Sequence, residues 1–148
     1  MRIRLLLAIL ALSFALTGRV QADLKLAMAE PNLEKRSRLA LDNASAAYKE
    51  LRSAYDKGEL EAVSTAAKEI EESVELAHAS LKQTGKIPRK SPKYFKAAEI
   101  ATRDLVRRLE AFQREMSFDD RPMLESTKKK VQQVHDELLI GLMEGNRK

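Results

Sequence analysis

The chain has 148 residues, with 27 Lys or Arg against 22 Asp or Glu, so its net charge is +5. It contains no cysteine, which excludes disulfides, thiolate metal sites, thiol nucleophiles and haem attached through paired cysteines. We find no glycine-rich phosphate loop and no nucleophile elbow, and we therefore predict that the protein is not an enzyme.

The first 22 residues have the organisation of a secretory signal peptide. Arg2 and Arg4 precede an apolar run over residues 5–16, and the sequence Val-Gln-Ala at residues 20–22 offers a cleavage site. The apolar run is too short for a transmembrane helix. We expect cleavage near Ala22, which leaves 126 residues (148 − 22) in an exported, periplasmic or extracellular chain.

After a segment predicted to be flexible, residues 23–30, the chain is predicted to form one all-α domain over residues 31–145. Apolar residues recur there at alternating spacings of three and four, as in helices that pack at a shallow angle. The expected helices span residues 31–56, 59–84, 92–116 and 120–144, before a tail at 146–148. Short connections favour antiparallel neighbours, so we predict an up-down-up-down four-helix bundle.

The helix ends are marked by glycine, proline and short polar residues. Gly58 is expected to follow the first helix in the left-handed conformation. Ser91 is predicted to cap the third helix ahead of Pro92, and Asp119 or Asp120 to cap the fourth.

The third predicted helix carries a basic surface. On a helical wheel its five outward cations fall within an arc of roughly 80° that contains no acid and only one apolar residue, Ile100. Three further cations lie in the preceding loop. The eight residues are Lys86, Arg89, Lys90, Lys93, Lys96, Arg103, Arg107 and Arg114.

Two interpretations of this surface stay open. It is either a solvated outer face or a site for an anionic envelope component, such as phospholipid or lipopolysaccharide headgroups, or for an acidic partner protein. We do not expect nucleic acid, because the chain is predicted to be exported and lacks an aromatic stacking surface. The charge asymmetry supports a partner: residues 23–85 carry net −3 and residues 86–148 net +5.

The second predicted helix is expected to turn four glutamates outward, namely Glu61, Glu69, Glu72 and Glu75. Apolar residues are also predicted on outer faces, at Leu76, Ile100 and Ile140. Single exposures of this kind are ordinary. Together they leave room for a homodimer, or for a structural role without a ligand.

His78 and His135, the two histidines, are predicted at the boundary between core and solvent on the second and fourth helices. These helices run in the same direction in the predicted bundle, so the rings would lie at similar heights. Such a pair is an alternative site for haem or a metal. Glu75 and His78 also have the Glu-x-x-His spacing of carboxylate-bridged di-iron bundles, although the counterpart of Glu75 on the fourth helix is Gln132.

The stretch GELEAVSTAAKEIEESVELAH, residues 58–78, resembles the final helix of the soluble periplasmic four-helix b-type cytochromes. The resemblance covers one predicted helix of four. It implies a haem ligand at His78, with Met28 or Met143 as the opposite ligand. Without that site, no cofactor is expected.

Overall fold

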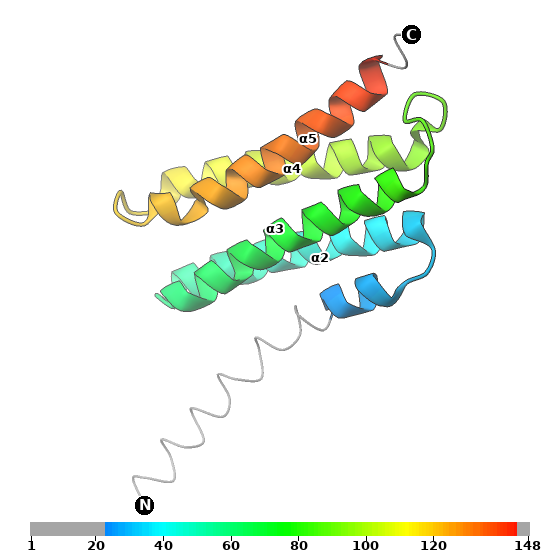
Figure 1. The fold of residues 1–148 in the computed structure, drawn as a ribbon. Coiled ribbons are helices and arrows are strands. Elements are labelled where there is room, and N and C mark those ends of the chain that lie inside the picture. Colours follow the sequence, from blue (N-terminus) through cyan, green and yellow to red (C-terminus); the bar gives the residue numbers. More distant parts are fainter. Residues whose placement is uncertain (1–22, 145–148) are drawn as a thin grey trace, which may run out of the picture.

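The computed structural model describes residues 23–144 (Figure 1). The predicted signal peptide, its cleavage site and the predicted tail lie outside the described residues. Within them the chain is all-helical and has no strand, which confirms the all-α part of the prediction. A short 3-10 helix, η1 (Arg121–Leu124), accompanies the four long helices, which are α2 (Leu33–Asp56), α3 (Leu60–Gln83), α4 (Pro92–Glu115) and α5 (Glu125–Glu144).

The long helices form two hairpins that lie against each other. In Figure 1 each long helix runs opposite to the one before it, so α2 pairs with α3 and α4 pairs with α5. Across the two hairpins, α3 contacts α5 and α2 contacts α4. The α2–α3 turn and the α4–α5 turn therefore lie at one end of the molecule, and the α3–α4 connection lies at the other.

All four long helices contribute to one core. Leu51, Ile70, Leu109 and Val131, one from each helix, are completely buried. Between α2 and α4 the ring of Phe112 packs edge to face against Tyr55, with the ring centroids 5.5 Å apart. The alternating spacing of three and four thus places one apolar stripe of each helix toward its neighbours.

The residues at the helix ends adopt only some of the predicted capping roles. Gly58 has φ +72° after the end of α2, as expected. Ser91 precedes α4, but its side chain makes no capping hydrogen bond. Asp120 occupies the position before η1, but its side chain makes no capping hydrogen bond, and its carboxylate instead accepts hydrogen bonds from Tyr55 and Ser117. Because η1 intervenes, α5 begins at Glu125.

Residues 23–29, which we expected to be flexible, are helical and pack on the outside of the first hairpin. Ala27 is completely buried against Ala40 of α2 and Ala77 of α3. Three small side chains allow this close approach. Leu76, predicted on an outer face, is half-buried beside the same cluster.

Among the described helices, none combines the length with the apolar composition needed to cross a membrane.

Candidate functional site

The eight predicted cations form an exposed surface, here called the basic surface, along α4 and the connection before it. The opposite side of α4 is fixed by the core, because Phe95, Ala98, Leu109 and Phe112 are buried. That anchoring forces the cations toward solvent. From Lys93 to Arg114 they span about 30 Å at 1.5 Å per residue.

Six of the eight cations of the basic surface make no ion pair with a carboxylate of residues 23–144. Lys86 pairs with Glu34 of α2, and Arg103 pairs with Glu99 at 3.4 Å. No carboxylate of residues 23–144 lies within 4 Å of the other six charged groups, which belong to Arg89, Lys90, Lys93, Lys96, Arg107 and Arg114. Lys93 instead lies 5.2 Å from the ring centroid of Tyr94. Positive charge without a partner raises the local concentration of anions.

A groove of about 410 Å³ borders the basic surface between α2 and α4. Ile100 lines it together with small or aliphatic side chains, namely Leu41, Ala44, Ala97 and Ala101. Arg103 and Arg107 line it from α4, and Asp42 lines it from α2. The sequence prediction missed this groove, because no property of a single helix shows which side chains of α2 meet α4.

Arg108 also lines the groove, although we did not single it out from the sequence. Its guanidinium pairs with Asp104, donates to the Ser45 hydroxyl at 3.5 Å and lies 5.9 Å from the Tyr48 ring centroid. The spacing of four between Asp104 and Arg108 was a usable signal in the sequence. Arg108 is therefore held by the protein, whereas Arg107 has no carboxylate partner among the described residues.

Two glutamates occupy places that the sequence pattern did not predict. Glu69, expected to face outward on α3, is buried and accepts a hydrogen bond from Asn43 Nδ2 at 2.9 Å. The outward prediction for Glu69 is therefore wrong, because α2 covers that flank of α3 and supplies a donor. Glu99 of α4 is buried between Arg103 and His135. Glu61, Glu72 and Glu75 are exposed, as expected.

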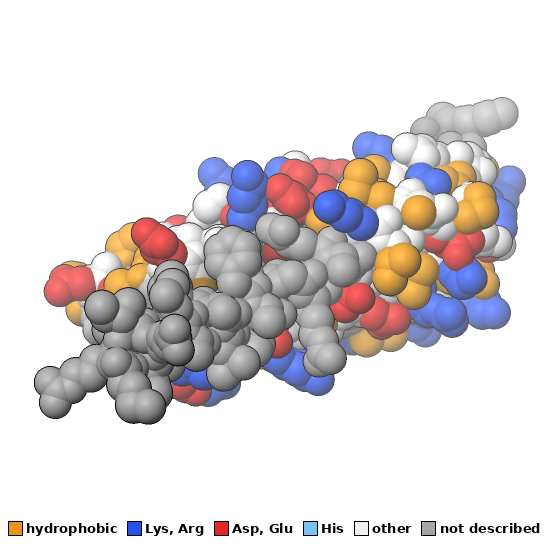
Figure 2. Space-filling view, turned by 90° about the horizontal axis from the view of Figure 1, so that it is seen from below, with side chains coloured by type: hydrophobic (Ala, Val, Ile, Leu, Met, Phe, Trp, Pro, Cys, Tyr) orange, Lys and Arg blue, Asp and Glu red, His pale blue; other side chains and the backbone are white. Residues whose placement is uncertain are grey.

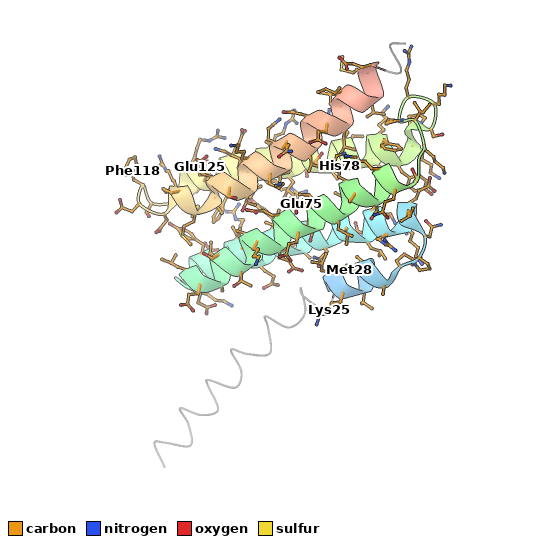
Figure 3. All side chains as sticks on the ribbon, in the orientation of Figure 1. Lys25, Met28, Glu75, His78, Phe118 and Glu125 are labelled. Carbon is orange, nitrogen blue, oxygen red and sulfur yellow. The ribbon has the colours of Figure 1, made fainter. Side chains whose placement is uncertain are left out.

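His78 lies on the side of α3 that faces α5 (Figure 3). Its Nδ1 is 3.6 Å from Glu137 Oε2. Burial lowers the pKa of His78, and the opposing effect of the Glu137 carboxylate only partly offsets it. A groove of about 370 Å³ beside His78 is also lined by Glu75 and Lys130, which pair at 2.6 Å.

His135 faces α4, where its Nδ1 is 3.7 Å from Glu99 Oε1 and has no hydrogen-bond partner. The two histidines thus lie next to different carboxylates on different helices. Within residues 23–144 no cluster of three or more His, Asp or Glu side chains has metal-binding geometry. Met28, on the N-terminal helix (Figure 3), and Met143, at the end of α5, are both largely exposed. The haem site stays a prediction.

The chain matches no protein-family model, no curated protein and no solved structure. Its function is therefore inferred from its own residues.

Proposed function

We propose that the chain is an exported, non-catalytic four-helix bundle, released from a signal peptide near Ala22, whose basic surface binds an anionic component of the cell envelope. The observation that carries this proposal is the set of six exposed cations without a carboxylate partner among the described residues. Structural ion pairs explain only Lys86 and Arg103 in this set of eight.

The form of the basic surface favours an extended phosphate-bearing surface over a small anion. Its cations lie along one helix over about 30 Å and continue into the α3–α4 connection, whereas a small anion needs a few converging donors. Ile87 and Ile100, which are 37% and 44% exposed, lie among these cations. Cations mixed with exposed aliphatic side chains match the headgroup region of an anionic membrane.

Vesicle binding tests the proposal. The chain from Asp23 is sedimented with vesicles of phosphatidylcholine alone or mixed with phosphatidylglycerol. We expect binding only to the anionic vesicles, and loss of that binding at about 0.5 M salt, where the Debye length is a few Å. Binding that persists in high salt contradicts the electrostatic mechanism.

A charge-matched pair of variants locates the binding surface. In the first, the five α4 cations of the basic surface become glutamate, namely Lys93, Lys96, Arg103, Arg107 and Arg114. In the second, five exposed lysines elsewhere become glutamate, namely Lys49, Lys57, Lys68, Lys82 and Lys129. Both have the same net charge. We expect at least a tenfold loss of vesicle binding in the first and a clearly smaller loss in the second. Equal losses would mean that total charge, and not the basic surface, governs binding.

A further inference from the structure

The turn between α4 and α5 exposes an aromatic side chain, Phe118, whose ring centroid lies 6.0 Å from the guanidinium carbon of Arg121. Phe118 is 80% exposed, more than any other large hydrophobic side chain of residues 23–144. It lies at the end of the molecule, away from the α3–α4 connection (Figure 3). An exposed aromatic side chain of this size is typical of the residues that anchor protein–protein contacts.

Hydrogen bonds from α2 hold this turn in one conformation. The Tyr55 hydroxyl accepts from the Ser117 amide at 2.9 Å and donates to Asp120 Oδ2 at 3.0 Å. The Ser117 hydroxyl also donates to Asp120, at 2.7 Å. On the far side, Arg121 donates to the carbonyl oxygens of Met116 and Arg114. Phe118 is thus presented by an ordered turn, and little entropy remains to be lost when a partner binds.

The turn also carries an acid without a partner. Asp119 follows Phe118 and is exposed, and no cation of the described residues lies within 4 Å of its carboxylate. Its neighbours differ: Glu115 pairs with Arg52, and Glu125 pairs with Lys128. The turn therefore combines one aromatic ring with one unpaired negative charge.

The α2–α4 groove offers apolar side chains and one arginine that is unpaired within residues 23–144. Its floor is apolar, and Ala97 and Ala101 leave space beside the exposed side chain of Ile100. Arg103, Arg107 and Arg108 line it from α4, and the carboxylates of Asp42 and Asp104 line it as well. Arg103 pairs with Glu99 and Arg108 pairs with Asp104, so Arg107 is the one of these arginines without a carboxylate partner among the described residues. A volume of about 410 Å³ lies within the usual range of about 300–1,000 Å³ for sites that enclose a ligand group.

We propose that the turn of one molecule, residues 117–120, docks into the α2–α4 groove of a second copy of this chain. The Phe118 ring lies on Ala97, Ile100 and Ala101, and the Asp119 carboxylate contacts Arg107. This inference goes beyond the proposed function, because it names a second copy of the chain as a partner for part of the basic surface. The two contact surfaces differ, so the contact is heterologous and leaves a free turn and a free groove.

The groove and the turn lie at different places along the molecule. Figure 2 shows hydrophobic side chains mixed with Lys and Arg at the right-hand end of the molecule, where Figure 1 has the α3–α4 connection. The turn that carries Phe118 and Asp119 lies at the opposite end.

Sedimentation velocity of the chain from Asp23, at low salt and rising concentration, tests the contact. We expect species larger than a dimer, because each added molecule leaves one turn and one groove free. Phe118→Ala and Arg107→Glu should each remain monomeric. A mixture of these two variants should form a dimer and nothing larger, because Phe118→Ala retains the groove and Arg107→Glu retains the turn.

Two controls test whether association depends on this contact or only on the net charge of α4. Arg114→Glu makes the same charge change on α4 outside the groove, and it should associate like the parent. Asp119→Arg combined with Arg107→Asp in one chain should restore association that either change alone removes. A monomeric parent, or a mixture that forms no dimer, would overturn the proposal.

The outcome is independent of membrane binding. Phe118→Ala leaves all eight cations in place, so it should bind anionic vesicles as the parent does. Association without vesicle binding would disprove the membrane function alone. Vesicle binding without association would disprove docking between copies alone.

Discussion

Asn43 of α2 donates a hydrogen bond from Nδ2 to Oε1 of Glu69 on α3, over 2.9 Å, and both side chains are at least nine-tenths buried. The same amide group donates to the Ser73 hydroxyl at 2.8 Å. A polar pair in this position fixes the register of the first hairpin, because any sliding of α2 along α3 leaves a buried carboxylate without its donor.

We therefore expect Asn43→Leu to lower the free energy of unfolding by about 2 kcal/mol, the usual cost of depriving a buried charged group of a hydrogen bond. The double variant Asn43→Leu/Glu69→Leu should be destabilised by less than the sum of the two single variants. Urea unfolding of all four proteins measures this coupling. Glu72→Leu, at an exposed position of the same helix, serves as the control. Strictly additive effects of Asn43→Leu and Glu69→Leu would contradict the pairing.

The stability of the protein should fall as the pH drops below about 6.5, the ordinary pKa of histidine. Burial lowers the pKa of His78 in the folded state, with Glu137 of α5 opposing this effect and Lys82 of α3 adding to it. In this pH range the unfolded chain takes up a proton that the folded chain resists, so protonation favours unfolding. The loss continues until the pH lies below the folded-state pKa.

His78→Gln should flatten this pH dependence. The urea midpoint, measured from pH 7.5 down to about 5, should fall less in the variant than in the parent. Titration of the His78 ring protons by NMR gives a direct check, with an inflection below the ordinary pKa. An inflection at or above 6.5 would mean that the Glu137 carboxylate outweighs burial.

Tyr55→Phe should loosen the α4–α5 turn. The variant loses the hydroxyl that accepts from the Ser117 amide and donates to Asp120. We expect a loss of about 1–2 kcal/mol in unfolding free energy and faster hydrogen exchange of the Ser117 amide. Tyr94→Phe is the matched control, since no hydrogen bond joins its half-buried side chain to residues 23–144. An unchanged exchange rate at Ser117 would show that the hydroxyl does not order the turn.

Ala27→Leu should destabilise the molecule although it adds apolar surface. Ala27 is completely buried against Ala40 and Ala77, so a larger side chain must push the N-terminal helix away from α2 and α3. Overpacking of this kind costs about 1–3 kcal/mol. Ala29→Leu, at an exposed position of the same helix, should change stability by less than about 0.5 kcal/mol. Thermal unfolding of both variants checks the difference, and equal melting temperatures would place Ala27 outside the core.

The repeating pattern of apolar residues was enough to predict the all-α class. It also placed the cations of α4 on a single outer surface, because both properties belong to individual helices. Val63, Ile70, Val74 and Leu81 recur at spacings that bring them to one side of α3 whatever that side touches. Gly58 was predictable for the same reason, since a left-handed residue after a helix is a local requirement.

The packing of the helices against one another decided which polar residues are buried and where the groove lies. Glu69 and Glu99 lie on the flanks of their helices, and such positions are buried only where a neighbouring helix covers them and supplies a partner. The groove beside Arg107 exists because α2 and α4 meet through small side chains, and the N-terminal helix packs because Ala40 and Ala77 leave room for Ala27. Each of these features depends on residues far apart in the chain. A helical period fixes which way a side chain points from its own helix, and only the packing of whole helices fixes what it meets.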